Sequence, residues 1–245
     1  MKRRTTDERT TMSTTSTPRR RDASRTGGKA RLDRDTIIAT GLELAADSAS
    51  ATLSVRELGT RLGADPTAIY RHFRNKEQLM EALLDALIRR SVDAVTAEPD
   101  DWRARLRQLA TATLDVFAAH PAVGVEATVL TTHGTGELDA VELMLDALTR
   151  AGLDGDDLVR HYALFAAHVL SSSAGIARAR GERRSQGFAD EPTSPWFDGP
   201  ILADPRKYPL ITSINTRLVE LEDRELFTLG VESIIQAVER TAAGD

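Results

Sequence analysis

The chain has 245 residues, enough for one large domain or for a small domain joined to a medium-sized one. Hydrophobic residues make up 41% of it and aromatic residues only 4%, which indicates a helical core built mainly from Ala and Leu. It contains no Cys, which excludes disulfides, zinc–thiolate sites and thiol catalysis. No apolar run approaches the roughly 18 residues of a membrane span, and the first thirty residues lack an apolar signal segment. We therefore expect a soluble, cytoplasmic protein without membrane contact.

The net charge of −5 is unevenly distributed along the chain. Residues 1–31 hold ten Lys or Arg and three acidic residues, a charge of +7, so the remaining 214 residues carry −12. Residues 1–30 have almost no apolar side chains, and we predict that they form a disordered basic arm. Such an arm either contacts a polyanion such as DNA or is a dispensable leader. The sequence leaves both interpretations open.

A first helix is predicted from Leu32 to about Ala49, and a dense series of helix start and stop signals follows it. Ser54 and Glu57 are spaced as a capping box, and Gly63 supplies the positive φ that ends a helix. Asp65 and Pro66 then restart the chain as N-cap and first helical residue. Two short helices joined by a Gly-containing turn form a helix-turn-helix, whose second helix enters the major groove of DNA.

The second of these helices is expected to present small, hydrogen-bonding or cationic side chains, with no acid after its cap. These side chains are Thr67, Ala68, Tyr70, Arg71 and His72. Their one-sided chemistry suits contact with phosphates and base edges. The alternative is a helical hairpin whose Tyr and Arg merely lie at the surface. Asn75 caps a third helix, expected to reach about Thr96, and Lys76 lies at its N-terminus, where the helix dipole favours phosphate.

This region resembles the DNA-binding domain of the tetracycline-repressor (TetR) family. The resemblance rests on Leu-Ser-Val-Arg-Glu-Leu-Gly from Leu53 and on Leu-Gly-Ala-Asp-Pro-Thr-Ala-Ile-Tyr-Arg-His-Phe-Arg-Asn-Lys-Glu-Gln-Leu from Leu62. It implies that Arg56 reaches a base edge and that Tyr70 and Lys76 anchor phosphates. Family members commonly have Thr where this chain has Ala68, which removes one contact and gives more weight to Thr67. The expected DNA-binding residues are Arg56, Pro66, Thr67, Ala68, Tyr70, Arg71, His72 and Lys76.

Beyond residue 98 the pattern is helical throughout, so we expect an all-α protein. A three-helix head at residues 31–78 would bind DNA, and a larger helical domain at residues 79–245 would bind a ligand and dimerise. The expected helices of this second domain are Trp102–Ala119, a shorter one from Pro121 through Leu130, Glu137–Ala151, Asp156 to about Arg180, and Asp223–Thr241.

The helices at 156–180 and 223–241 each carry two apolar stripes. A helix that is apolar on two faces is buried on two sides, so we expect a homodimer through a four-helix bundle of these segments, as the family resemblance also implies. Burial within a single monomer is the alternative. The segment at 181–208 is rich in Gly, Pro and aromatic residues, which is typical of a lid over a ligand or a strap onto a partner subunit, although a disordered connection stays open.

No catalytic or metal-binding pattern is evident, and we expect neither an enzyme nor a cofactor. His161 and His168 are seven residues apart with no carboxylate at ligand spacing, so core or partly exposed histidines are the simpler interpretation. The family resemblance implies an inducer pocket, with plain core packing as the alternative. Its expected lining is Trp102, Phe117, Thr128, His133, Tyr162, Phe165 and His168.

Together these patterns predict a cytoplasmic, nucleoid-associated transcriptional repressor. It would bind a palindromic double-stranded DNA operator as a homodimer and be released by a small-molecule effector. The alternative is a small-molecule-binding or scaffold protein that retains the helix-turn-helix head without operator-specific binding.

Overall fold

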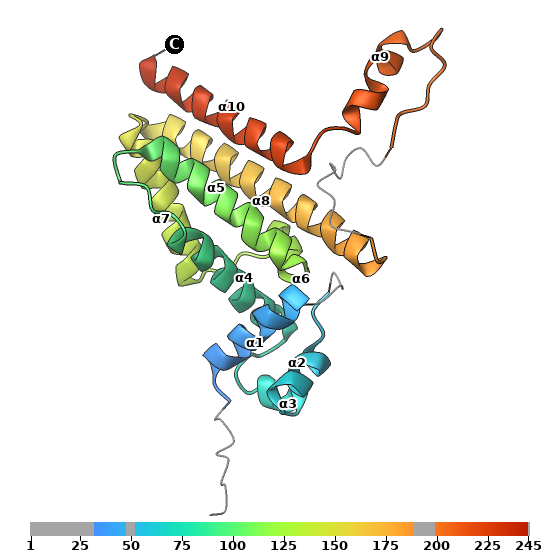
Figure 1. Ribbon diagram of the computed structural model, residues 1–245. Helices are drawn as coiled ribbons and strands as arrows, with labels where there is room; N and C mark the ends of the chain where they lie inside the picture. Colours follow the sequence, from blue (N-terminus) through green and yellow to red (C-terminus); the bar gives the residue numbers. More distant parts are fainter. Residues whose placement is uncertain (1–31, 48–51, 189–198, 245) are drawn as a thin grey trace, which may run out of the picture. The chain divides into compact units, whose positions relative to one another are not determined.

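The computed structural model describes residues 32–47, 52–188 and 199–244, which form helices joined by turns (Figure 1). No β-strand occurs within these ranges, and the expected all-α class is confirmed. No helix in the described ranges is long and apolar enough to cross a membrane. The predicted basic arm and Ala49 lie outside the described residues.

The helix-turn-helix signals in the sequence produce the expected local structure. The first four helices are α1 (Arg34–Asp47), α2 (Val55–Leu62), α3 (Pro66–Ile69) and α4 (Lys76–Asp93). Ser54 Oγ accepts a hydrogen bond from Glu57 N at 3.3 Å, and Gly63 adopts φ 59°. The side chains of Asp65 and Asn75 cap α3 and α4 in the same way, each with a 2.8 Å bond.

The second helix of the motif is shorter than the sequence pattern indicates. It ends at Ile69, so Tyr70, Arg71 and His72 lie in the turn that follows and not on the helix itself. The reason is spatial: Ile69 and Phe73 are both buried, and Asn75 must already be extended, at φ −154°, to begin α4. The expected end of the following helix, about Thr96, was three residues too far.

The remaining helices are α5 (Trp102–Ala119), α6 (Pro121–Gly124), α7 (Thr135–Arg150), α8 (Gly155–Ser185), α9 (Pro209–Leu218) and α10 (Asp223–Ala243), with a 3₁₀ turn η1 (Val125–Thr128) after α6. The bounds of α5 agree with the prediction. The single helix expected from Pro121 was wrong, because it divides into α6 and η1. The irregular segment expected from residue 181 was wrong at its start, because α8 continues to Ser185. Helix α9 was not predicted from the sequence.

The core consists of two hydrophobic clusters. One lies among α5, α7, α8 and α10 and includes Leu106, Phe165 and Val231. The other combines Ile69 and Phe73 of the head with residues of α4, α5, α6 and α8. Since α4 belongs to both parts and packs on α1, α5 and α7, the expected domain boundary at residue 78 falls inside a continuous helix. A displacement of α4 would therefore shift the contacts of the head and of the helices beyond it.

Candidate DNA-binding head and ligand cavity

The side chains expected to contact DNA lie close together in sequence and are mostly open to solvent. Arg56, Thr67, Tyr70, Arg71 and Lys76 are exposed, and Pro66, Ala68 and His72 are half-buried. Tyr70 is the clearest case, because 42% of a large aromatic residue is exposed beside the buried Ile69. Burial of Ile69 and Phe73 fixes the turn, and the side chains between them point away from the core.

Thr67 is held in place by the cap of α3. Its hydroxyl donates a 2.6 Å hydrogen bond to Asp65 Oδ1, and its backbone N–H donates a second one to the same oxygen at 2.8 Å. These two hydrogen bonds lower the pKa of Asp65. Because the hydroxyl proton points to Asp65, Thr67 can offer only acceptor lone pairs to a partner.

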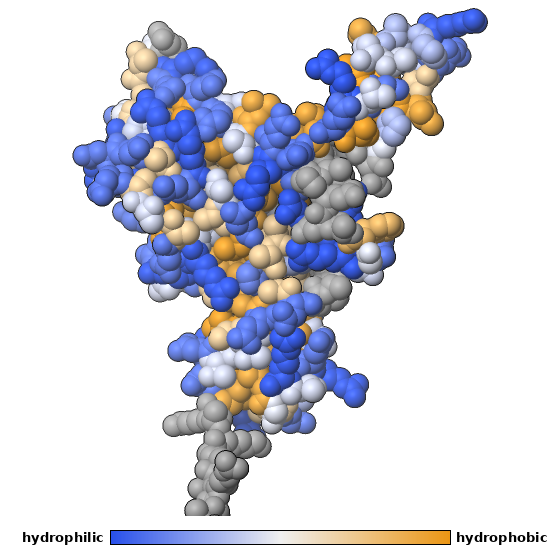
Figure 2. Space-filling model, viewed as in Figure 1, coloured by the Kyte–Doolittle hydropathy of each residue, from blue (hydrophilic) through white to orange (hydrophobic). Residues whose placement is uncertain are grey.

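The stretch from Pro66 to Lys76 carries positive charge and no acid. Arg71, Arg74 and Lys76 are all exposed, and none forms an ion pair within the described part of the chain. Arg74 was absent from the expected set, although its place between Phe73 and Asn75 was a visible signal. Hydrophilic side chains also cover much of the visible face of the molecule (Figure 2). Unpaired exposed cations of this kind suit phosphate contacts.

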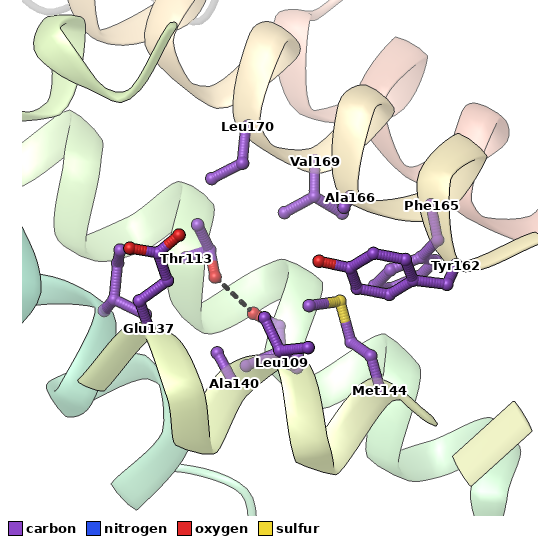
Figure 3. Close-up of a pocket in the computed structure, with 12 residues that line it drawn as sticks. Leu109, Thr113, Glu137, Ala140, Met144, Tyr162, Phe165, Ala166, Val169 and Leu170 are labelled. Atoms are coloured by element: carbon purple, nitrogen blue, oxygen red, sulfur yellow. Dashed lines mark hydrogen bonds between the residues drawn. The ribbon is translucent and has the colours of Figure 1, made fainter. Parts of the chain in front are cut away.

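A cavity of about 80 Å³ lies among α4, α5, α7 and α8 (Figure 3). Nine of its twelve lining residues are apolar, and Thr113, Glu137 and Tyr162 are the exceptions. The lining residues are Ile88, Leu109, Thr113, Glu137, Ala140, Val141, Met144, Tyr162, Phe165, Ala166, Val169 and Leu170. A mainly apolar wall with a few polar atoms is typical of small-molecule sites.

Two of the seven expected pocket residues, Tyr162 and Phe165, line this cavity. Trp102 is buried with the Arg103 guanidinium 4.3 Å above its ring, and Phe117 belongs to the cluster shared with the head. Neither contributes to the cavity wall, because each is already covered by packing. Helical spacing identified buried faces but could not show which of them leave space.

The other three expected residues also lie away from the cavity wall. Thr128 is exposed at the end of η1, and His133 lies in an exposed loop with φ 51°. His168 stacks on Phe227 and its Nε2 lies 3.1 Å from the Phe227 carbonyl oxygen. Nowhere in the described ranges do three or more potential metal ligands of the His, Asp or Glu type come together.

The polar groups of the cavity are differently engaged. The Thr113 hydroxyl donates to Leu109 O within α5 at 2.8 Å, as Figure 3 shows. The Tyr162 hydroxyl points into the cavity, and burial together with the negative charge of Glu137 raises the pKa of Tyr162. Glu137 Oε2 accepts hydrogen bonds from the backbone N–H groups of Thr132 and His133, both at 2.7 Å.

Asp85 of α4 holds the N-terminus of α7, a contact that was not predicted from the sequence. Its carboxylate accepts from Gly136 N at 3.2 Å and from Glu137 N at 2.9 Å. The hydroxyl of Thr132 lies 2.9 Å from Asp85 Oδ1. Since α7 has no side-chain cap of its own, Asp85 supplies it from a neighbouring helix. Gly134 before α7 and Gly136 in its first turn were a signal of close approach. We call these contacts the Asp85 clasp.

Two family models of known proteins match nearly all of the residues that the structure describes. The family model for bacterial regulatory proteins of the tetR family matches residues 37–83, and the model for the tetracyclin repressor-like C-terminal domain matches residues 96–242. A helix-turn-helix transcriptional repressor of Mycobacterium tuberculosis is 29% identical over 226 residues, which cover 89% of this chain and 84% of the relative. The class G tetracycline repressor of Vibrio anguillarum is 40% identical over 79 residues, or 32% of this chain and 38% of its own.

Solved structures share the fold. Apo ActR from Streptomyces coelicolor superposes with a TM-score of 0.69 at 19% identity, covering 88% of this chain and 98% of ActR. ActR in complex with actinorhodin gives a TM-score of 0.67 at 22% identity, covering 87% and 99%. The capped head, the helical body and the two family models agree, and the chain therefore belongs to the tetracycline-repressor (TetR) family of bacterial regulatory proteins.

Proposed function

We propose that this protein is a homodimeric transcriptional repressor that binds a palindromic double-stranded DNA operator and is released by a small-molecule effector. The observation that carries the proposal is the continuity of α4, which begins in the helix-turn-helix head at Lys76 and contributes Ile88 to the cavity. A ligand that favours one position of α4 would thereby change the position of the head. This requires different ligand affinities for the DNA-bound and the free conformation.

The head supplies the DNA contacts in this proposal. Arg56 and Thr67 reach base edges, Tyr70 and Lys76 contact phosphates, and Arg71 and His72 contribute further contacts from the turn after α3. Pro66 and Ala68 allow close approach of the backbone. Arg74 joins this set because it is exposed and cationic beside Lys76. The relatives named as transcriptional repressors support the assignment.

The dimer would form through α8 and α10, which pack on each other within the chain. Both helices leave large apolar side chains in solvent: Val159 and Leu164 of α8 are 63% and 50% exposed, and Leu229 of α10 is 62% exposed. Gly230 of α10 meets the His168 ring of the same chain, where a Cβ would lie 2.2 Å away, so its small size gives no evidence for a partner subunit. The exposed residues and not Gly230 therefore support the interface.

The proposal of operator binding is tested by selecting DNA fragments from a random pool. Wild-type protein should enrich a palindrome at about 150 mM salt, where non-specific binding is weak, and the Tyr70→Ala/Lys76→Ala double variant should not. A matched control removes the exposed Lys207 and Tyr208, which lie outside the head, and should behave as wild type. Failure of folded, dimeric wild type to enrich any sequence would favour the scaffold alternative.

The dimer is tested by sedimentation. The Leu164→Glu/Leu229→Glu variant places charges on the proposed interface and should sediment as a monomer. Leu138 is a suitable control because it is 61% exposed on α7, and Leu138→Glu should leave the dimer intact. A monomeric wild type, or a dimer that survives both charges, would contradict this interface.

A further inference from the structure

At one end of the cavity described above lies a carboxylate, Glu137, with an oxygen that can still accept a hydrogen bond from a ligand. Glu137 Oε2 accepts hydrogen bonds from the loop before α7, whereas Oε1 has no donor within the described ranges. At the other end the Tyr162 hydroxyl points into the cavity, and apolar side chains form the walls between them (Figure 3). A ligand that fits must therefore be apolar along its length and offer a hydrogen-bond donor to Glu137.

The charge of the lining narrows the class of ligand. The twelve lining residues include Glu137 but no Lys, Arg or His. No cationic side chain of the lining neutralises this carboxylate, and the pKa of Tyr162 is raised first by burial and then by the charge of Glu137. A protonated amine would gain a charge-assisted hydrogen bond to Glu137, which is stronger than a neutral one. A ligand carboxylate or phosphate at the same point would be repelled.

The size of the cavity shows that a ligand must widen it. About 80 Å³ is well below the roughly 300–1,000 Å³ of sites for drug-sized molecules. Helix α7 supplies four lining residues, and its opposite face, including Leu138 and Glu142, is in solvent. The other long walls, α5 and α8, are covered by further helices such as α10. Outward movement of α7 is therefore the route that disturbs the fewest buried contacts.

The Asp85 clasp opposes that movement. It fixes the first turn of α7 to the middle of α4, and the two helices approach closely there. A Cβ at Gly134 would lie 2.2 Å from the Asp85 carboxyl carbon, and one at Gly136 would lie 2.3 Å from the Asp85 backbone oxygen. Glu137 belongs to the same turn, because its N–H donates to Asp85 while its side chain lines the cavity.

We propose that the cavity takes a hydrophobic amine whose protonated nitrogen binds Glu137, and that its entry opens the Asp85 clasp and so releases α4. The effector is then a hydrophobic amine, and its binding changes the position of the head through the contact between α7 and α4. This inference rests on the proposed function only for its effect on DNA. The binding of the amine is a separate property of the free protein.

The class of ligand is tested with three probes of one skeleton: phenylbutylamine, phenylbutanol and phenylbutyrate. Calorimetry on the DNA-free dimer should give tightest binding for the amine and weakest for the carboxylate. Glu137→Gln keeps the shape of the side chain and should weaken amine binding about tenfold or more, as loss of a charged hydrogen-bond partner requires. The control Glu142→Gln, an exposed acid of the same helix, should bind as wild type.

The clasp is tested with a variant that should strengthen amine binding, whereas Glu137→Gln should weaken it. Asp85→Ala removes the contacts that entry must break, so it should tighten amine binding about fivefold, the size of a lost helix cap. Simple attraction between the amine and Asp85 would predict weaker binding instead. Asp93→Ala, which removes an exposed acid from the same helix, is the control. If Asp85→Ala does not fold, Asp85→Asn preserves the volume and should act in the same direction.

Equal affinity for amine and carboxylate, or an unchanged affinity in Glu137→Gln, would overturn the ligand class. Unchanged or weaker amine binding in both Asp85 variants would overturn the clasp. Failure of the proposed function is distinguishable from these outcomes, because an amine that binds the free protein as expected while no operator is found would leave only the role in repression wrong. An operator that is bound while amine and carboxylate bind alike would refute only this inference.

Discussion

The head and the helical body are stabilised by contacts of different range. In the head, Ser54, Asp65 and Asn75 each cap a helix through a hydrogen bond spanning two or three residues. In the body, ion pairs join helices far apart in sequence, such as Arg103 with Glu239 and Arg180 with Asp223. The head is thus specified by local chemistry, and the body by side chains that meet only after folding. Substitutions should therefore affect stability differently where they remove a local cap and where they remove a contact between distant helices.

The largest effect is expected where a charge is buried between two helices. Arg180 of α8 contacts both carboxylate oxygens of Asp223 at 2.9–3.1 Å, and the Asp223 side chain is only 2% exposed. Arg180→Met leaves that carboxylate buried without this cation and should lower the free energy of unfolding by about 3 kcal/mol. Urea unfolding followed by circular dichroism measures the change.

The control for this prediction is on the same helix. Arg160 pairs with Asp156 and Asp157, but all three side chains are at least half exposed. Arg160→Met should therefore change stability by less than about 0.5 kcal/mol. An equal loss of unfolding free energy in the two variants would show that burial of the Arg180 pair does not determine its contribution to stability.

A steric change at the join between α4 and α7 should have the next largest effect. Because a Cβ at Gly136 would meet backbone that cannot rotate away, Gly136→Ala should cost about 2 kcal/mol as the two helices separate. Gly199 has no atom within 4 Å of the corresponding position, so Gly199→Ala is the matched control. Comparison of the two melting temperatures tests the prediction, and coincident melting would contradict it.

Loss of a local cap should cost less. Ser54→Ala removes the acceptor for Glu57 N and should lower stability by about 1 kcal/mol. Ser185 is also exposed, and its hydroxyl donates to Glu182 O, which already accepts from Gln186 N, so Ser185→Ala should be close to neutral. Hydrogen exchange should place the loss in α2. Faster exchange spread evenly over α7 and α8 would show that the head is not an independently specified region.

The smallest effect is expected when the pH is lowered, which acts on His120 at the junction of α4 and α5. His120 Nε2 lies 3.3 Å from Arg90 Nη1 and its Nδ1 lies 2.7 Å from Val116 O. Burial lowers the pKa of His120, the hydrogen bond to the Val116 carbonyl partly opposes this shift, and the charge of Arg90 adds a smaller lowering. The unfolded chain therefore binds this proton more readily, so the stabilisation is complete above about pH 6.5 and declines as the pH falls below it.

His120→Gln removes the titrating group and provides the comparison. The difference in unfolding free energy between wild type and variant should shrink as the pH is lowered from 7.5 to 5.5. A difference that is constant over this range would show that His120 does not titrate differently in the folded and unfolded states.

The parts of the fold that could be predicted are those with a signal inside one element. The bounds of α5 agree with the helix expected from the helical spacing after Trp102, which ends before Pro121, and the start of α4 agrees with the cap expected at Asn75. The exposure of Tyr70 was expected because Ile69 and Phe73 on either side of it face inward, and both are buried. Helix α3 was predicted too long, because helical spacing cannot show that the cap of α4 at Asn75, six residues after Ile69, demands extended backbone.

The cavity could not be predicted in the same way. Tyr162 and Phe165 were identified because an aromatic stripe on α8 is visible in the sequence, whereas Ile88, Thr113 and Met144 lie on three other helices. Periodicity indicates that a side chain faces inward, but not whether the facing helices fill the space. Trp102 and His168 were expected at the cavity for their chemistry, and each instead meets a neighbour at close range.

The amino-acid sequence alone therefore determined the helical class, the capped head and the family, because caps, turns and recognition residues act over a few neighbouring positions. The cavity, the clasp between Asp85 and α7, and the buried pair of Arg180 with Asp223 depended on the tertiary structure. They join residues about 40 to 50 positions apart or more, and their geometry exists only once whole helices have packed. A carboxylate such as Glu137 has no distinctive meaning until folding places it against an apolar cavity.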